Sequence, residues 1–462
     1  MRVILCLALA ALFMAPTWSF MAASRPRGTS SSLDAVVVSG EKLFTGVSAK
    51  KLVKSSSVWA TFGDLAAKAK AINLGQGFPD WDPPDFVRQS LKDAVDSQFH
   101  QYTRPAGHPA LVELLASRYS YHLDRAVDPD SEVAITVGAS QALYLSLLTL
   151  VEEGDEVVMF DPYFELYAKQ IESVGGVAKY VPLGGASATP EDPWALDAAA
   201  LEAAVSGDTK VLILNSPHNP TGKVFSAQEM EAVAATVRKY PGLKVLSDEV
   251  YKYTVYNPHA REGGGDTVVG HTHFARLPGM WERTLTIASC GKTFSVTGWQ
   301  VGWMVGPADL VGPVQEALPT LQFCVATPMQ QALTGVLQQA DTPYEGHDTY
   351  YEWLRHQFTN KRAILEKGMV AAGIEPVPAQ GGYFLMGHLP TNHPGASKYA
   401  QPGEPYDFSF CRQLIAERGV ASIPASPFFS GVHDPSVTPY ARFAFCKRDE
   451  TLRDAARRLS AP

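Results

Sequence analysis

Apolar and polar positions alternate in two different rhythms from about residue 85 onward. Short runs of apolar, often β-branched residues predict strands, and the longer stretches between them have the spacing of amphipathic helices. Several runs are apolar at almost every position, as strands are when both faces of a parallel sheet are covered. The predicted strands are VAITV (133–137), EVVMF (156–160), KVLILN (210–215), LKVLS (243–247) and TLTIAS (284–289). This order predicts an α/β fold with a mostly parallel sheet.

One of the intervening helices has a recognisable beginning. The segment SAQEMEAVAATVRKY (226–240) opens on Ser226, and Glu229 follows three residues later. Serine and glutamate at this spacing form a capping box, in which each side chain accepts a hydrogen bond from the other residue's backbone amide. The spacing therefore predicts a helix that begins directly after Ser226.

The regular alternation ends near residue 325, and this change predicts the domain organisation. We expect a large sheet-containing domain over residues 85–325 and a smaller α+β domain over residues 326–462. An N-terminal arm over residues 45–84 is expected to join the smaller domain. Residues 1–33 have a different composition and are excluded from the fold.

The first 33 residues have the composition of a targeting presequence. Residues 3–15 form an apolar run that is too short to span a bilayer comfortably, and the following TWSFMAASRPRGTSSS is basic, serine-rich and free of acids. The two parts together resemble a bipartite presequence of algae with secondary plastids. We therefore expect a plastid location, with a mitochondrial presequence or a plain secretory signal as the alternatives.

Composition excludes several classes of function. The chain has 462 residues, 46% of them hydrophobic, and a net charge of −8, which argues against binding to nucleic acid or to anionic membranes. None of the five cysteines forms a Cys-x-x-Cys pair, so neither a disulfide framework nor a zinc cluster is expected. The histidines show no metal-ligand spacing, and no metal site is predicted.

Lys292 carries the most informative chemistry in the chain. It follows the predicted strand 284–289 and lies in the glycine- and serine-containing segment SCGKTFSVTGW (289–299). Removal from water disfavours the ammonium form, and a neutral lysine amine is the form that attacks an aldehyde to give a Schiff base. Lys292 is therefore a candidate attachment point for a cofactor aldehyde.

Polar groups that suit such a cofactor follow four other predicted strands. In open α/β sheets, ligands bind beyond the carboxyl ends of the strands. In TVGASQ (136–141), a Gly-Ala-Ser turn opens a helix whose free amides favour an anion, and DPYF (161–164) has an aromatic ring that could stack on a flat ligand. NSPHNPTG (215–222) has two asparagines on a rigid turn, and SDEVY (247–251) has an acid and a tyrosine. Taken singly, each also has a structural interpretation as a helix cap, a core aromatic or a turn.

Taken together, these segments resemble the pyridoxal-phosphate-dependent class I/II aminotransferases of fold type I. The branch that contains the kynurenine, glutamine and methionine aminotransferases is the more similar one. Six motifs carry the resemblance, in the family's order and over most of the chain from about residue 45: NLGQGFPD (73–80), QYTRPAGHPAL (101–111), NSPHNPTG, SDEVY, GKTFSVTGW and ARFAF (441–445). The resemblance implies a large parallel-sheet domain, a smaller α+β domain and pyridoxal 5′-phosphate as the cofactor.

The resemblance also assigns cofactor-binding residues. Lys292 matches the lysine that binds the cofactor aldehyde, Asp248 the partner of the ring nitrogen, and Tyr251 a ligand of the ring hydroxyl, and these three form the expected catalytic set. Phe164, or less closely its neighbour Tyr163, matches the ring that stacks on the cofactor. The remaining cofactor-binding positions are Gly138, Ala139, Ser140, Asn215, Asn219, Ser289 and Tyr102. Tyr102 is expected to reach the phosphate in a neighbouring subunit, which implies a homodimer.

Substrate-binding positions follow from the same resemblance. Arg442 matches the arginine that binds the substrate α-carboxylate, and Gly77 and Asn219 also match substrate contacts. Trp59 and Phe323 match aromatic residues around the substrate side chain, although core packing is an equal alternative for both. Gln300 departs from the family, which has lysine or arginine there as a phosphate ligand, so weaker cofactor binding is expected.

The implied reaction is a ping-pong transfer of an amino group from an L-amino acid to a 2-oxo acid. Aromatic, sulfur-containing and glutamine-like donors all suit the expected pocket, and kynurenine is one of them. A cysteine-S-conjugate β-lyase, or another lyase with the same cofactor, is the first alternative. A non-catalytic ligand-binding regulator is a remote alternative, because no basic DNA-binding segment precedes residue 45.

Overall fold

The computed structural model describes residues 58–256, 270–390, 393, 395–431 and 440–461, and the backbone of two short strands nearer the N-terminus. These strands, β1 (Val36–Val38) and β2 (Glu41–Phe44), pair antiparallel. The chain separates into a unit of residues 1–54 and a unit of residues 55–462. The predicted presequence, residues 1–33, lies outside the described residues, as do residues 45–57 of the predicted arm.

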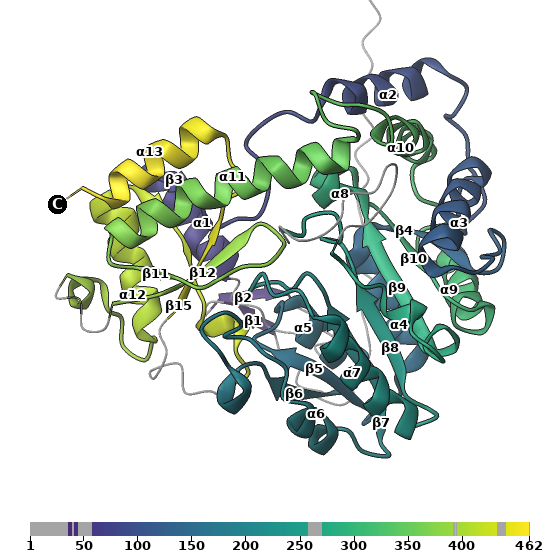
Figure 1. Ribbon diagram of the computed structural model, residues 1–462, viewed down its shortest axis with the longest axis horizontal. Coiled ribbons are helices and arrows are strands. Elements are labelled where there is room, and N and C mark those ends of the chain that lie inside the picture. The colour runs from purple at the N-terminus through teal and green to yellow at the C-terminus, as the bar shows by residue number, and fades with distance from the viewer. Residues whose placement is uncertain are drawn as a thin grey trace, which may run out of the picture. The chain divides into compact units, whose positions relative to one another are not determined.

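A seven-stranded sheet forms the centre of the larger unit (Figure 1), in the order β4-β10-β9-β8-β7-β5-β6. Its strands are β4 (Val133–Val137), β5 (Glu156–Asp161), β6 (Val177–Pro182), β7 (Thr209–Asn215), β8 (Lys244–Asp248), β9 (Thr284–Ser289) and β10 (Val301–Val305). Strand β10 runs antiparallel to both of its neighbours, β4 and β9, and the other paired strands of this sheet are parallel. All five predicted strands are confirmed, as is the α/β class, while β6 and β10 were not predicted.

Alternate strand residues pack into two hydrophobic clusters, one on each face of the sheet. On one face, Met159 and Ile213 pack with residues of α4 (Gly138–Leu150), α5 (Leu166–Ser173) and α9 (Ala308–Leu321). On the other face, Phe160 and Leu214 pack with residues of α3 (Pro109–Leu123) and α7 (Ala227–Lys239). Because successive side chains of a strand point to opposite faces, this two-sided cover explains why the runs are apolar at almost every position.

The predicted capping box at the beginning of α7 is confirmed. Ser226 Oγ accepts a hydrogen bond from the Glu229 amide over 3.2 Å, and Glu229 Oε2 accepts one from the Ser226 amide over 2.8 Å. Met230, Val233 and Val237 then face the core at helical spacing. Helix α6 (Ala198–Ala204), between β6 and β7, is also capped, because Asp197 Oδ1 accepts hydrogen bonds from the amides of Ala199 and Ala200.

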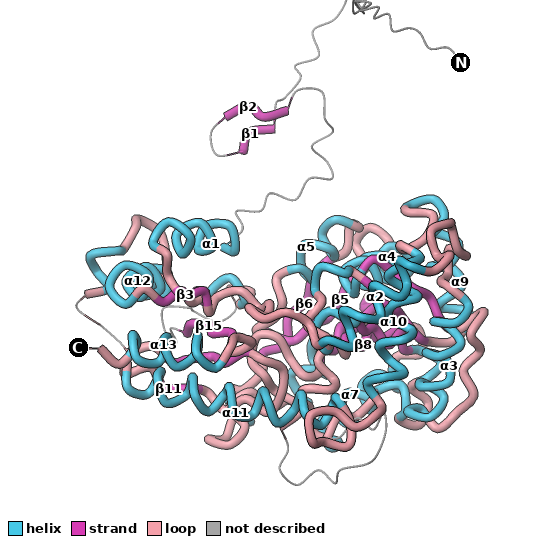
Figure 2. The backbone as a smooth tube through the Cα atoms, turned by 90° about the horizontal axis from the view of Figure 1, so that it is seen from above, coloured by secondary structure: helices cyan, strands magenta, loops and turns pink. Residues whose placement is uncertain are grey.

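A second, antiparallel sheet has the order β11-β12-β15-β14 and lies beside the first (Figures 1 and 2). Its strands are β11 (Glu375–Pro376), β12 (Phe384–His388), β14 (Ile423–Pro424) and β15 (Tyr440–Ala444), and the parallel pair β3 (Ile72–Asn73) and β13 (Val420–Ala421) adjoins it. The helices of this region are α1 (Val58–Ala69), α11 (Tyr350–Ala371), α12 (Tyr406–Gln413) and α13 (Asp449–Leu459). The pairing of β3 with β13 joins residues 72–73 to the C-terminal region.

Two further observations bear on the predicted domain boundaries, which remain predictions. Helix α10 (Thr327–Ala340), which follows the predicted boundary at residue 325, packs against α2 (Asp85–Asp96) and α3 on the side of the large sheet. Helix α11 reaches from α13 to the neighbourhood of α8 (Cys290–Thr293), where Tyr350 donates a hydrogen bond to the Thr293 carbonyl (Figure 1). Among the described residues, no helix has the length and apolar character needed to cross a membrane.

Candidate active site

A cavity of 280 Å³ lies at the edge of the large sheet where the parallel strands end. Asn215 ends β7, Asp248 ends β8 and Ser289 ends β9, while Val137 at the end of β4 pairs with Val301 at the start of the reversed β10. The cavity brings together most of the predicted site residues: Trp59, Gly77, Gly138, Ala139, Ser140, Phe164, Asn215, Asn219, Asp248, Tyr251, Ser289, Lys292 and Arg442. We refer to it below as the active-site cavity.

Tyr102 and Phe323 are the two predicted residues that do not line this cavity. Their side chains are 82% and 47% exposed, and their rings contact each other with centroids 4.8 Å apart. Of the two alternatives for stacking, Phe164 lines the cavity, whereas Tyr163 is buried against Tyr180 with ring centroids 5.2 Å apart.

Lys292 projects into the middle of the cavity from α8, one turn after β9. Its Nζ lies 6.0 Å from the centre of the Tyr251 ring and 5.9 Å from that of Tyr383, and it forms no hydrogen bond or ion pair with the described residues. Burial lowers the pKa of the Lys292 amine. The amine is therefore positioned and electrostatically biased to act as a nucleophile or a base.

Asp248 is a buried carboxyl group on the floor of the cavity. Its Oδ2 accepts a hydrogen bond from the Tyr167 hydroxyl over 2.6 Å, and its Oδ1 accepts a weaker one from the Val250 amide over 3.3 Å. Burial raises the pKa of Asp248 to about 6. No described basic side chain forms an ion pair with it, so a bound cationic group has room to do so.

Asn215 and Asn219 join the strand ends to the turn that follows β7. The Asn215 amide donates to the Asp248 carbonyl over 3.0 Å, and its oxygen accepts from the Asn219 backbone amide over 2.8 Å. Asn219 Oδ1 in turn accepts from Arg442 over 2.9 Å. The oxygens of both side chains are thus used in positioning neighbours, and the side-chain nitrogen of Asn219 remains the donor best placed for a ligand.

An anion cradle is formed where β4 leads into α4. Gly138 adopts φ +67°, and its amide donates to the Gln300 carbonyl over 2.8 Å, while the next amides of the first helical turn have no intrahelical partner. A Cβ at Gly302 would lie 2.4 Å from the Gly138 carbonyl carbon, so the close approach of β10 requires glycine there. The side chain of Gln300 lies over this turn and donates to the Thr297 carbonyl.

Arg442 lies on β15 at the opposite end of the cavity and is only 1% exposed. Its two terminal nitrogens donate to Asn219 Oδ1 and, over 3.0 Å, to the Gly75 carbonyl. The guanidinium carbon lies 3.9 Å from the ring centre of Phe384 and 4.6 Å from that of Trp59. No described carboxylate pairs with it, although burial of an unpaired charge is costly and here lowers the pKa of Arg442 to about 10.

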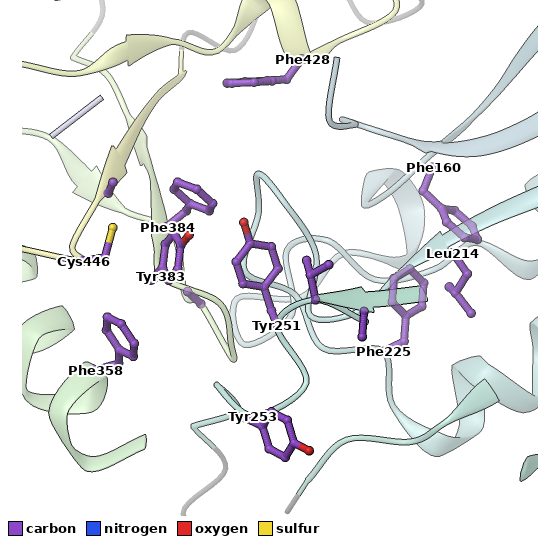
Figure 3. Close-up of a cluster of buried hydrophobic side chains, with 14 of the residues drawn as sticks. Phe160, Leu214, Phe225, Tyr251, Tyr253, Phe358, Tyr383, Phe384, Phe428 and Cys446 are labelled. Carbon is purple, nitrogen blue, oxygen red and sulfur yellow. The ribbon is translucent and has the colours of Figure 1, made fainter. Parts of the chain in front are cut away.

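Aromatic rings from three separate segments surround this end of the cavity. Tyr251 contacts Tyr383 edge to face at 5.2 Å and Phe384 at 6.1 Å, and Phe428 lies nearby (Figure 3). Trp59 is held by a hydrogen bond of 2.7 Å from its indole nitrogen to Glu165 Oε1. These rings exclude water from the space around Arg442.

Several residues of the cavity were not predicted from the sequence. Tyr167 donates the hydrogen bond to Asp248, and it lies in the first turn of α5, three residues after Phe164, whose carbonyl accepts from its backbone amide. Phe384 had no local signal, because it reaches Arg442 only through the pairing of β12 with β15. Gln76, Phe78 and Thr297 also line the cavity.

Comparison with known proteins gives the family to which this architecture and this site belong. The family model described as aminotransferase class I and II matches residues 69–459. A kynurenine–oxoglutarate transaminase from Dictyostelium discoideum is 38% identical over 416 residues, which cover 86% of this chain and 92% of the relative. The chain belongs to the class I and II aminotransferases.

Solved structures of aminotransferases share the fold of this chain. A protein from Escherichia coli, whose crystal structure and reactivity identify a methionine aminotransferase function, has a TM-score of 0.77 and 31% identity over 90% of this chain and 99% of its own. N-succinyldiaminopimelate aminotransferase from Mycobacterium tuberculosis has a TM-score of 0.77 and 36% identity over 88% of this chain and 97% of its own. The predicted fold type I architecture is confirmed.

This aminotransferase is a pyridoxal 5′-phosphate enzyme, and its cavity has the groups that the cofactor requires. The amides at the start of α4 and the hydroxyl of Ser289 would hold the phosphate, Asp248 the ring nitrogen, and Phe164 the face of the ring. Lys292 would bind the aldehyde. The unpaired buried Asp248 and the glycine-dependent cradle are what make this assignment fit.

Proposed function

We propose that this aminotransferase takes its amino group from large apolar or aromatic L-amino acids, with kynurenine among them, and passes it to a 2-oxo acid. The observation that carries the proposal is Arg442, a buried cation without a described acidic partner that lies between the rings of Trp59 and Phe384. A guanidinium in this setting suits the α-carboxylate of a substrate whose side chain is itself apolar. The names of the Dictyostelium and mouse relatives, both kynurenine–oxoglutarate transaminases, point in the same direction.

The residues of the cavity would divide the work as follows. Arg442 binds the α-carboxylate and so directs the substrate Cα toward Lys292, which is otherwise without a partner. The bound cofactor ring supplies the electron sink that makes the Cα proton removable. As a neutral amine, Lys292 would be the base that takes this proton and carries it during the transfer, and Asp248 would keep the ring nitrogen protonated. Trp59 and Phe384 keep water away during the transfer.

Both half-reactions use the same groups, because a 2-oxo acid presents the same carboxylate to Arg442 as the amino acid does. The reaction is therefore ping-pong, with the first product released before the second substrate binds. β-Elimination from cysteine S-conjugates begins with the same proton removal and is the alternative outcome at this site. Formation of pyruvate and ammonia in the absence of an amino acceptor would identify it.

The test is a panel of L-amino acids and 2-oxo acids with the purified, cofactor-loaded enzyme. We expect kynurenine, phenylalanine and methionine to give higher kcat/KM than alanine and aspartate, because the cavity offers aromatic rings beside Arg442 and its described lining has no basic side chain other than Arg442 and Lys292 to pair with a distal carboxylate. Trp59→Ala should lower kcat/KM for the aromatic donors more than for alanine. A preference for aspartate, or equal losses for both kinds of donor, would contradict the proposal.

We infer that the active form is a homodimer in which Tyr102 reaches the cofactor phosphate of the other subunit. Two exposed aromatic rings in mutual contact, Tyr102 and Phe323, support this, since monomers seldom expose such pairs without a binding role. Phe323 also adopts φ 65°, an uncommon backbone conformation for a bulky residue. The same contact would bring Phe323 to the partner's substrate.

Subunit mixing tests this inference. Lys292→Ala and Tyr102→Ala are each expected to impair activity, but a mixed dimer contains one site with both natural residues. Refolding the two variants together should therefore restore activity above the sum of the separate preparations. A monomer by light scattering, or no gain on mixing, would show that Tyr102 does not act across an interface.

We also propose a plastid location, supported by the apolar and basic halves of residues 1–33. A fluorescent protein fused after residue 57 and expressed in an alga with secondary plastids should enter the plastid. Accumulation in mitochondria or secretion would contradict the proposal.

A further inference from the structure

A second cluster of chemically active side chains lies outside the active-site cavity and consists of Glu249, His271 and His273. Glu249 Oε2 lies 2.6 Å from His273 Nδ1 and 3.2 Å from His271 Nε2. The three ligand atoms all lie within 4.8 Å of one another. The side chains are 1%, 0% and 6% exposed for Glu249, His271 and His273, so the cluster is removed from bulk water.

The chain holds these three side chains in place from two directions. Glu249 directly follows β8, where its amide donates to the Ile287 carbonyl over 2.8 Å and its Oε1 accepts from the Ser247 hydroxyl over 3.0 Å. His271 and His273 are two residues apart, and His273 has an extended backbone conformation. Side chains two apart along an extended chain point the same way, which directs both imidazoles at one carboxylate.

The hydrogen bonds of the cluster are incomplete. The Nδ1 of His271 and the Nε2 of His273 are buried and have no hydrogen-bond partner among the described residues, and the Nε2 of His271 has only the ion-pair contact with Glu249. A neutral imidazole carries one donor and one acceptor, and buried polar atoms in folded proteins are almost always paired. These imidazole nitrogens can therefore bind an additional group, such as a metal ion, that is not among the described residues.

We propose that Glu249, His271 and His273 bind a divalent transition-metal cation of the zinc class. One carboxylate oxygen and two imidazole nitrogens are a ligand set that zinc takes in proteins, with a fourth position left for water. Ligand atoms around a tetrahedral zinc ion, with bonds of about 2.0–2.1 Å, lie about 3.3 Å apart. The 3.2 Å separation between Glu249 and His271 already matches this spacing, and His273 would have to move away from Glu249 by about 0.7 Å.

A cavity of 490 Å³ gives a metal ion a route to the cluster. It is lined by both histidines and by His122, whose ring centre lies 5.0 Å from that of His273. A metal site needs such a path and room for a water ligand, and this cavity offers both. It is a different cavity from the one that contains Lys292.

Neighbouring positive charges oppose a cation and limit its affinity. Lys252 is buried, and its Nζ donates to the Tyr119 hydroxyl over 3.2 Å, with the Tyr119 ring 6.1 Å from that of His273. Arg125 and Arg276 also line the cavity. Replacement of the buried charge, Lys252→Met, should therefore strengthen metal binding, which an adventitious surface site would not do.

A second histidine cluster provides the matched control. His347, Glu352 and His356 also lie within metal-binding reach of one another at the beginning of α11. Here the His347 Nδ1 to Glu352 Oε1 distance is 3.7 Å, and these side chains are 23% and 15% exposed. This cluster is not held by the sheet, and we expect it to bind zinc weakly at most. The variant His356→Ala shows whether zinc binding comes from this cluster or from Glu249, His271 and His273.

The experiment is a titration of the cofactor-loaded full chain, after treatment with a chelator, with zinc and cobalt(II) salts. Calorimetry should give one zinc ion per chain. Cobalt(II) should give the strong visible absorption of a tetrahedral site, and this absorption should disappear when zinc displaces the cobalt. His271→Ala and His273→Ala each remove a direct ligand and should weaken zinc binding by about 100-fold or more, since loss of an outer-shell partner alone costs about 10- to 100-fold. His356→Ala should leave it unchanged.

Several results would overturn the proposal. These are the absence of saturable binding by the wild type, a weak octahedral cobalt spectrum, and binding that survives the double histidine variant or disappears in His356→Ala. Cofactor absorbance and melting temperature check the folding of each variant. If the alanine variants do not fold, Glu249→Gln keeps the size of the side chain while removing its charge, and it must also weaken binding.

Discussion

The two ends of the active-site cavity bind anions by opposite means. At the α4 end, backbone amides, the helix dipole and neutral side chains form the cradle, and Gln300 is solvent-exposed. At the β15 end, the anion site is the full charge of Arg442, almost completely buried between aromatic rings. Among the described residues that line the cavity, Lys292 and Arg442 are the only basic side chains, and burial favours the neutral amine for Lys292.

This difference suits the two anions that the ends receive. A cofactor phosphate stays in place through many turnovers and is also held by the ring and by Lys292, so several modest contacts suffice. A substrate carboxylate arrives and leaves in each half-reaction, and one strong, oriented contact must position Cα. The cost of burying Arg442 is offset by its hydrogen bonds to Asn219 and Gly75 and by the surrounding rings.

The largest effect is expected from Lys292→Ala, which leaves both anion-binding ends intact. Turnover should fall by about 10⁵-fold or more, because the base and nucleophile between the two ends is lost. The visible absorbance that depends on the covalent link should disappear, while the cofactor should still bind. Stopped-flow absorbance and equilibrium dialysis measure these properties, and substantial remaining turnover would exclude the assigned role of Lys292.

The next effect is expected at the carboxylate end. Arg442→Lys keeps a charge but loses the two-pronged donor geometry, and kcat/KM should fall by about 10²- to 10³-fold. Cofactor affinity should fall much less, because among the described residues assigned to the cofactor Arg442 bonds only to Asn219. Steady-state kinetics with an aromatic donor and a cofactor titration separate the two effects. An equal loss of cofactor affinity would show that the ends are not independent.

Local patterns were sufficient to predict the strands that carry the site. The five apolar runs are confirmed as β4, β5, β7, β8 and β9, and the residues that end them meet at one edge of the sheet because the strands are parallel. Strand β6 was missed because it lies at the edge of the sheet and is only partly buried, so its pattern is weak. Gly138, Ala139, Ser140 and Ser289 at the α4 end could be identified in this way, but β10, which packs on the Gly138 turn, was not predicted.

Long-range pairing limited the prediction of the β15 end. The rings around Arg442 come from α1, β12 and the segment near Phe428, and only the pairing of β12 with β15 and the fold of the N-terminal region bring them together. The cluster of Glu249 with His271 and His273 was missed for the same reason. A single His-x-His pair is a weak signal until a carboxylate from a distant strand is known to face it.

Gln300→Arg tests whether the α4 end binds the cofactor phosphate less tightly because it lacks a charged side chain like that of Arg442 at the β15 end. The new guanidinium would lie over the Gly138 turn, and cofactor affinity should rise by about tenfold through a charge-assisted hydrogen bond to the phosphate. Gln300→Ala is the control and should weaken binding only slightly. Titration of the apoenzyme, followed by absorbance, gives both dissociation constants. Equal constants for the wild type and Gln300→Arg would mean that the cradle does not need a charged side chain.

The smallest expected effect concerns the aromatic wall at the other end. Glu165 accepts the indole hydrogen bond of Trp59 and pairs with Lys169 at 3.1 Å, so it positions the ring without lining the cavity itself. Glu165→Ala removes one hydrogen bond and should raise KM for aromatic donors by about three- to tenfold, with kcat nearly unchanged. Glu165→Gln keeps an acceptor and should restore most of the affinity. An equal rise in KM for alanine and for phenylalanine would contradict this role. It would mean that the negative charge of Glu165 acts on Arg442, and that its hydrogen bond to Trp59 does not select aromatic donors.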